Sequence, residues 1–106
     1  MVSIDDVKAL GLRIAEIVDV QPHPNADRLY VLRVRLGDEE RILVAGIKSS
    51  YAQEDLIGKK IVVVTNLKPA TIRGIESQGM LLAADGGSVI SLLTVDRDVP
   101  SGSEVR

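Results

Sequence analysis

At 106 residues the chain has room for one domain with its own core but not for two. It has no cysteine, which excludes disulfides and thiolate metal sites, and its net charge of −2 excludes a broadly polycationic nucleic-acid binder. The charge is nevertheless uneven, because residues 41–80 carry six Lys and Arg against three Asp and Glu, whereas both flanking segments are acidic. A locally basic face is therefore compatible with this sequence.

The apolar residues are almost all Val, Ile, Leu and Ala, and only Tyr30 and Tyr51 are aromatic. A core of this kind favours a β-sheet. The N-terminus lacks the pattern of a signal peptide, and no apolar run is long enough to span a membrane. We therefore expect a soluble, cytoplasmic protein.

The chain begins with a predicted short helix and a long strand. Ser3, followed three positions later by an acidic residue, is typical of a helix start, and Gly11 is placed to end that helix. A strand is predicted over Leu12–Val20. Its apolar alternation slips between Ile14 and Ile17, which indicates a β-bulge.

The clearest strand is predicted over Leu29–Leu36, after a proline-rich interruption. Alternate residues from Tyr30 onward are apolar and form one face, with Arg33 and Arg35 on the other. A turn over residues 37–40 predicts a hairpin with a strand at Arg41–Ala45.

The second half of the chain predicts a short helix and further strands. These are a helix over Tyr51–Gly58, strands over Lys60–Thr65 and Gly79–Ala84, a polar loop over Asn66–Gln78, and a turn at 85–87 into a strand over Val89–Thr94. The pattern is all-β with short helices. It matches a five-stranded Greek-key OB-fold barrel over residues 1–106 with a C-terminal extension at about 88–106, although the strand count equally fits another small barrel.

Catalytic chemistry has little support in the sequence. His23 is the only histidine and lies between two prolines, so we interpret it as structural or solvent-exposed. No carboxylates cluster with the spacing of metal ligands, and no glycine-rich phosphate loop is present. We therefore predict no enzymatic activity, no metal and no cofactor.

Two polar segments, Pro24–Arg28 and Asn66–Met80, are suited to RNA. Their basic side chains can meet phosphates, and their amide and hydroxyl groups can meet sugars or base edges. The alternative is that both are simple turns of a barrel, with Met80 filling the core.

Several motifs carry a family resemblance. They are Leu12-Arg-Ile, His23-Pro-Asn-Ala-Asp-Arg-Leu29, Leu56-Ile-Gly-Lys-Lys60, Asn66-Leu-Lys-Pro-Ala70 and Arg73-Gly-Ile-Glu-Ser-Gln-Gly-Met-Leu-Leu-Ala-Ala84. The chain resembles the tRNA-binding OB domain found at the C-terminus of methionyl-tRNA synthetases and as a free-standing, structure-specific tRNA-binding protein. It departs from that family at Val7, often Phe there, and at Arg28, often Lys there.

The resemblance implies non-catalytic tRNA binding that assists an aminoacyl-tRNA synthetase, most specifically methionyl-tRNA synthetase, in cis or in trans. It places the RNA contacts at Asn25, Arg28, Asn66, Lys68, Arg73, Ser77 and Met80. Because aromatic residues are scarce, base stacking should contribute little and binding should depend strongly on salt. The resemblance also implies a homodimer, for which Val89–Leu93 and the tail beyond it are candidate contacts; the alternative is that the tail packs on its own barrel.

Two other functions fit the same fold. One is a chaperone-like, peptide-binding OB-fold dimer related to bacterial export chaperones, and the other is a pure dimerisation module. Whether the chain is a free-standing protein or a domain of a synthetase stays open at this point.

Overall fold

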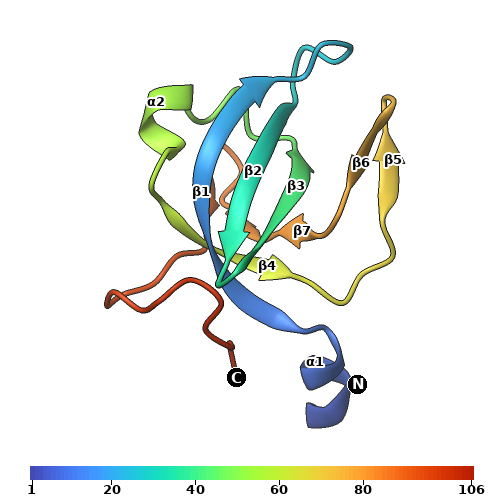
Figure 1. Cartoon of the computed structure of the whole chain (residues 1–106), viewed down its shortest axis with the longest axis vertical. Helices are drawn as coiled ribbons and strands as arrows, with labels where there is room; N and C mark the ends of the chain where they lie inside the picture. Colours follow the sequence, from blue (N-terminus) through green and yellow to red (C-terminus); the bar gives the residue numbers. More distant parts are fainter.

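One curled antiparallel sheet of five strands dominates the computed structural model, which describes all 106 residues (Figure 1). Its strands, in spatial order, are β3 (Glu39–Ala45), β2 (Tyr30–Leu36), β1 (Leu12–Pro22), β4 (Lys60–Val64) and β7 (Met80–Leu81). The helix α2 (Gln53–Leu56) lies between β3 and β4 along the chain. The strand content, the curled sheet and the position of this helix confirm the predicted all-β, OB-fold-like class.

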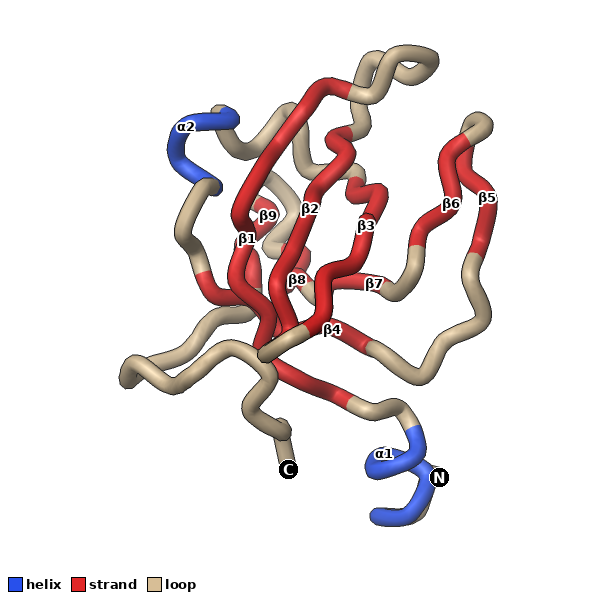
Figure 2. Tube along the Cα trace, in the orientation of Figure 1, coloured by secondary structure: helices blue, strands red, loops and turns tan.

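Two small hairpins stand outside this sheet. One pairs β5 (Ala70–Ile72) with β6 (Ile75–Ser77), and the other pairs β8 (Ala83–Asp85) with β9 (Ile90–Leu92). Figure 2 shows the β5–β6 hairpin standing apart from the sheet, to the right of β3. The predicted strand over Gly79–Ala84 is therefore interrupted, with its two halves in different sheets.

The core lies inside the curled sheet and is built from alternate strand residues. On β2, the predicted inward face is fully confirmed, since Tyr30, Leu32, Val34 and Leu36 are all buried while both arginines between them are exposed. The short helix α2 has no side-chain cap at its N-terminus and only four residues, which is too short for independent stability. Leu56, its last residue, is fully buried in the core. Burying a leucine side chain contributes about 1.5–3 kcal/mol, which stabilises the helix against the barrel.

The bulge in β1 lies elsewhere than predicted. The pairing register shifts between Ile17 and Asp19, not between Ile14 and Ile17. The irregular apolar pattern has another cause: Ala15 and Ile17 belong to the core, whereas Ile14 is buried outside it, at the point where the C-terminal tail pairs with β1. Both faces of β1 are thus covered at this point.

The tail packs on its own barrel. Ile14 exchanges backbone hydrogen bonds with Gly102 (2.6 Å) and Ser103 (2.8 Å), and the N–H of Val105 donates to Leu12 (2.9 Å). Residues 102–105 therefore pair with their own barrel, whereas Val89 and Leu93 remain 62% and 40% exposed. The opposite end of the chain differs: α1 (Ile4–Ala9) has the predicted capping box but buries none of its residues.

The segment predicted as a polar loop over Asn66–Gln78 contains the β5–β6 hairpin instead. Its two-residue turn, Arg73-Gly74, has positive φ at both positions, 53° and 91°. Such turns match the twist of the flanking strands but favour Asn-Gly or Asp-Gly. Because the first position is arginine, the sequence lacks the Asn-Gly or Asp-Gly signal that would have predicted a hairpin here. No helix in the structure is both long and apolar enough to cross a membrane.

Candidate nucleic-acid interface

The two predicted binding segments meet in space although about 48 positions separate them. The ring Nε2 of His23 lies 3.0 Å from the carbonyl oxygen of Ile72. The side-chain amide nitrogen of Asn25 lies 3.5 Å from the backbone carbonyl oxygen of Arg73. The β1–β2 loop and the tip of the β5–β6 hairpin therefore form one continuous surface, at the upper right of Figure 1. In OB-folds, the loops at these two places commonly bind nucleic acids.

Three exposed cations lie in the two segments: Arg28 in the β1–β2 loop and Arg73 at the hairpin tip, where the segments meet, and Lys68 before β5, at the base of the hairpin. We call them the interface cations. None forms an ion pair in the structure. The six Lys and Arg side chains that do form ion pairs all lie outside the two segments: Arg13, Arg33, Arg35, Arg41, Lys60 and Arg97. Lys8, Lys48, Lys59 and Arg106 form no ion pair either, so it is their place in the two segments that distinguishes the interface cations.

Arg73 has a strained backbone. It is the only non-glycine residue with a positive φ, at 53°. Residues other than Gly, Asn and Asp rarely adopt this conformation, and strain of this kind costs on the order of 1 kcal/mol. The strained turn carries an exposed guanidinium at the tip of the hairpin. Retained strain of this kind points to a binding role for Arg73.

Other residues of the same segment close the barrel. The buried hydroxyl of Ser77 accepts a hydrogen bond from the N–H of Val44 (3.0 Å) and donates one to the carbonyl of Gly79 (2.9 Å). Gln78 exchanges two hydrogen bonds with the backbone of Ile42, both 2.8 Å. These contacts provide hydrogen-bond partners for the backbone N–H and carbonyl groups on the edge of β3 that does not pair with β2. Ser77, expected from the resemblance to contact RNA, is only 4% exposed and has both hydrogen-bonding capacities in use, so we assign it to the fold.

Asn66 and Met80 take different positions. The side-chain amide of Asn66 donates to the carbonyl of Ala9 (2.6 Å) and so caps the C-terminal end of α1. Its side chain remains exposed and its amide oxygen has no partner. Met80 lies on β7 with 50% of its surface exposed, so the interpretation of Met80 as core filler is wrong.

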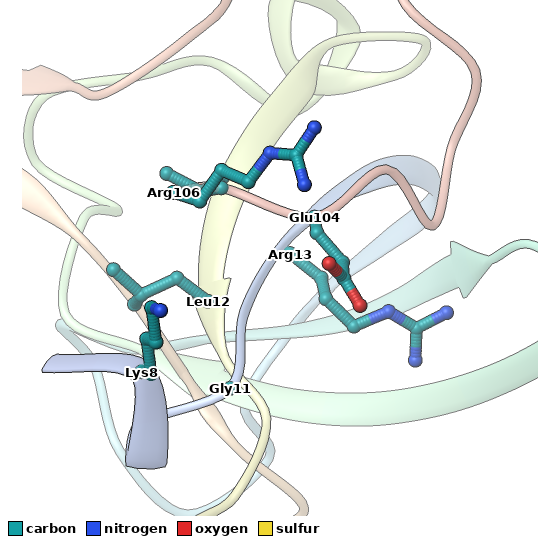
Figure 3. A pocket seen from close by; sticks show the side chains of 7 residues that line it. Lys8, Gly11, Leu12, Arg13, Glu104 and Arg106 are labelled. Atoms are coloured by element: carbon teal, nitrogen blue, oxygen red, sulfur yellow. The ribbon is translucent and has the colours of Figure 1, made fainter. Parts of the chain in front are cut away.

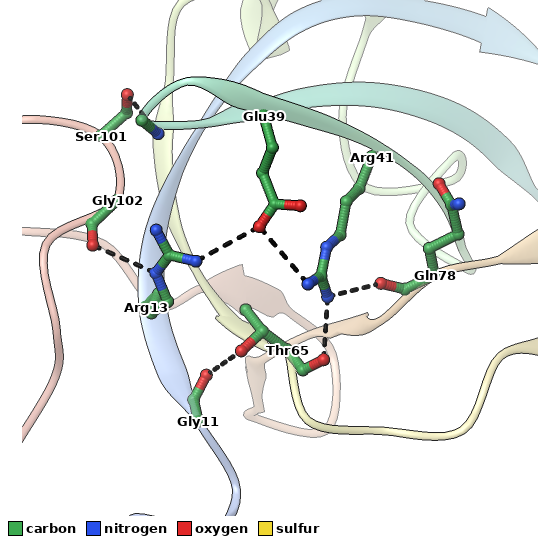
Figure 4. A network of polar contacts seen from close by, with 9 residues as sticks. Gly11, Arg13, Glu39, Arg41, Thr65, Gln78, Ser101 and Gly102 are labelled. Carbon is green, nitrogen blue, oxygen red and sulfur yellow. Dashed lines mark hydrogen bonds and ion pairs between the residues drawn. The ribbon is translucent and has the colours of Figure 1, made fainter.

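A polar network anchors both ends of the segment from Asn66 to Met80 (Figure 4). The guanidinium of Arg41 donates to the carbonyls of Thr65 (2.8 Å) and Gln78 (3.1 Å), which flank the β5–β6 hairpin. Glu39 lies between Arg41 and Arg13 and pairs with both, at 3.4 and 3.3 Å. No local pattern indicates this role of Arg41, since its partners are backbone carbonyls 24 and 37 positions along the chain.

His23 was also missed as a site residue. Its position between two prolines was the available signal, but the partner of its ring is 49 positions away. The imidazole is 4% exposed and joins the two segments.

A pocket of about 360 Å³ lies away from the interface cations, between the end of α1, the start of β1 and the C-terminus (Figure 3). Lys8, Arg13 and Arg106 line it together with Glu104, so it mixes both signs of charge. No group of three or more His, Asp or Glu residues is arranged to hold a metal ion. In α1, the N–H of Ser3 donates to the Asp6 carboxylate and lowers the pKa of that group.

Comparison with known proteins places these features in a family. The family described as "Putative tRNA binding domain" matches residues 12–104. The chain is 52% identical over 105 residues to a methionine–tRNA ligase of Thermococcus onnurineus and 50% identical over 106 residues to that of Nanoarchaeum equitans. These matches cover 99% and 100% of the chain but only 14% of each ligase.

Solved structures give the same fold over the full chain. A MetRS-related protein from Pyrococcus horikoshii superimposes with a TM-score of 0.92 at 33% identity, covering 100% of this chain and 98% of that one. The CsaA chaperone protein from Picrophilus torridus also superimposes with a TM-score of 0.92, at 29% identity and with 100% of each chain covered.

Proposed function

The chain belongs to the family of tRNA-binding domains homologous to the C-terminal part of methionyl-tRNA synthetase, and we propose that it binds tRNA non-catalytically, chiefly through its three interface cations. Arg28, Lys68 and Arg73 would contact backbone phosphates. Asn25, beside the hairpin tip, and Asn66 and Met80, at the two ends of the second segment, would make further contacts that set the position of the RNA. One observation carries this proposal: hydrogen bonds join the loop of Arg28 to the hairpin tip of Arg73, and neither these two exposed cations nor Lys68, in the same segment as Arg73, has a carboxylate partner.

The two tyrosines support phosphate contacts over base stacking. Tyr30 is 4% exposed, and its hydroxyl donates to the carbonyl of Tyr51 at 2.7 Å. Tyr51 packs against the core and accepts a hydrogen bond from the N–H of Leu92 at 3.0 Å. Since both aromatic rings are committed to the interior, stacked bases would supply little of the affinity.

The electrostatic mode predicts the salt dependence. Three phosphate contacts per domain correspond to a slope of log K against log salt of roughly −2.1 to −2.7. Affinity would then fall about 20- to 40-fold between 50 and 200 mM salt.

The test is a binding titration of tRNA and of an unstructured RNA of equal length over a salt series. We expect tRNA to bind more tightly, and we expect Lys68→Glu and Arg73→Glu to weaken binding strongly. Arg97→Glu is the matched control, because Arg97 is exposed and lies in the C-terminal tail, away from the hairpin. Equal affinity for both RNAs, or charge reversals no more harmful than the control, would contradict the proposal.

We further propose that the domain assists methionyl-tRNA synthetase in the cytoplasm, whether joined to it or as a separate chain. The ligases similar to this chain extend far beyond the matched region, so their catalytic apparatus lies elsewhere in those proteins. Adding or fusing the domain to a synthetase that lacks it should lower KM for tRNA and leave kcat unchanged, because the domain contributes only binding. Aminoacylation by the isolated domain would refute the non-catalytic assignment.

Helix α1 and the C-terminal segment both offer exposed apolar residues to the proposed homodimer. Ile4, Val7 and Leu10 recur at helical spacing, and they are 75%, 43% and 42% exposed. In the C-terminal segment, residues 102–105 are bonded to β1 of their own chain, but Val89 and Leu93 are 62% and 40% exposed. We propose that two copies meet through one of these surfaces: Val7→Lys yields monomers by light scattering if α1 is the contact, and Val89→Lys does so if the C-terminal segment is. Wild-type monomers at all concentrations would exclude the dimer.

A chaperone-like function is the second candidate, because the match to a CsaA chaperone protein covers both chains completely. An unfolded polypeptide added to the RNA titration separates the two functions. If the chain is a tRNA-binding module, the polypeptide leaves tRNA binding unchanged.

A further inference from the structure

We propose that His23 is a positioning residue that joins the β1–β2 loop to the β5–β6 hairpin and thereby fixes the position of Arg73 relative to Arg28. The inference rests on the proposed function, because the alignment of these cations matters only for a ligand that contacts both loops. It concerns a residue that would itself touch no RNA.

The hydrogen bonds of the ring define its chemical state. Nδ1 lies 3.0 Å from the backbone nitrogen of Asn25, which can only donate, and Nε2 lies 3.0 Å from the carbonyl oxygen of Ile72, which can only accept. Nδ1 must therefore be unprotonated and Nε2 must carry the proton. His23 is thus a neutral linker with an acceptor for its own loop and a donor for the hairpin.

The loop holds this ring rigidly. Pro22 and Pro24 flank His23, and a following proline restricts a residue to extended backbone. The N–H of His23 also donates to the carbonyl of Leu29 at 3.0 Å, which closes the loop. With 4% of its surface exposed, the imidazole has little freedom to turn.

The hairpin needs such support near its tip. Its strands have three residues each, and isolated hairpins of this size are marginal in water. At its base, Ser77 and Gln78 bond β6 to β3. Near the tip, the hydrogen bonds that join it to the rest of the chain come from His23 and, at the longer distance of 3.5 Å, from Asn25. Figure 2 shows the hairpin away from the sheet over this length.

The consequence is preorganisation of the binding surface. Arg73 follows Ile72 directly, so the bond to Ile72 places the tip that carries this cation relative to the loop that carries Arg28. Without the bond, RNA binding would have to order the hairpin, and the ordering cost would weaken affinity.

Two substitutions separate the two hydrogen bonds of the ring. In His23→Asn, the side-chain oxygen lies near the position of Nδ1 and can still accept from Asn25, as in an Asx-turn, but nothing reaches Ile72. In His23→Gln, the amide nitrogen lies near the position of Nε2 and can still donate to Ile72. The pair therefore tests the link between the loops apart from the turn within one of them.

We expect His23→Asn to weaken tRNA binding about fivefold, the size of one net hydrogen bond, and His23→Gln to remain within about twofold of the wild type. Hydrogen exchange at the amides of Ile72 and Ile75, the pair of β5 and β6 that lies next to the turn, should rise in His23→Asn and stay low in His23→Gln. Thermal unfolding of each variant controls for the overall fold. In the wild type, nitrogen NMR of the imidazole should show the proton on Nε2, a readout that needs no variant to fold.

Each other result would overturn the proposal. If both variants bind tRNA like the wild type, or if both lose equal affinity with equal stability, His23 does not position the hairpin for RNA. A proton on Nδ1 would exclude the link itself. A wild-type chain that does not prefer tRNA would overturn the proposed function and, with it, the RNA role of His23, and hydrogen exchange would show separately whether the link exists.

Discussion

Arg73 offers a substitution that should move stability and binding in opposite directions. Arg73 and Gly74 form a turn with φ values of 53° and 91°, and asparagine is strongly preferred at the first position of such a turn. Arg73→Asn should therefore relieve strain on the order of 1 kcal/mol. For a domain of about this size, that corresponds to a rise in Tm of roughly 4–8 °C. The same change removes a cation, so tRNA affinity should fall about tenfold, as expected when a charge-assisted hydrogen bond is removed.

Thermal unfolding by circular dichroism and a tRNA titration on the same preparation measure both effects. Arg73→Lys is the control, because it keeps a cation and the strain, and it should bind tRNA nearly as well as the wild type without gaining stability. If the Arg73→Asn variant unfolds at a lower temperature than the wild type, or binds tRNA as tightly, the reasoning is refuted. Arg73 would then not combine a strained backbone with a charge that contributes to tRNA binding.

Three further predictions concern the fold around the interface. Gly79→Ala should destabilise the chain by about 2–4 kcal/mol in chemical unfolding, because Gly79 has a φ of 146° and an added Cβ would lie 2.9 Å from the carbonyl oxygen of Val64. Ser77→Ala should cost about 1–3 kcal/mol, because it leaves a backbone N–H of β3 without its acceptor, yet the salt dependence of tRNA binding should not change. The Ser3 N–H lowers the pKa of the Asp6 carboxyl, so the ionised carboxylate stabilises α1 above the unfolded-state pKa near 3.8. This stabilisation should be lost as the pH falls below that value, which the NMR amide signals of α1 would show. Retention of those signals in acid would contradict the assignment.

The sequence was sufficient to predict what local patterns control. Spacing and turn chemistry predicted four features correctly: the alternation on β2, the turn into β3, the capping box of α1 and the helix between β3 and β4. The basic character of the interface was likewise visible, since the interface cations lie in the motifs that carry the family resemblance.

Non-local contacts account for what could not be predicted. Nothing in the sequence indicates that the tail covers Ile14, so its burial resembled a bulge. Ser77 has the composition of a binding residue, but its hydroxyl serves the edge of a strand 33 positions away. The link from His23 to Ile72 spans 49 positions, and arginine at a turn that favours asparagine concealed the hairpin to which it connects.

The most direct test of the central claim is the salt dependence of tRNA binding for the wild type and for Lys68→Gln and Arg73→Gln. If the interface cations neutralise phosphates, each substitution should reduce the magnitude of the slope of log K against log salt by about 0.7–0.9 for every phosphate that is no longer neutralised, whereas Arg97→Gln should leave it unchanged. Slopes that do not change when Lys68 and Arg73 are neutralised would contradict the claim that these residues hold the tRNA backbone.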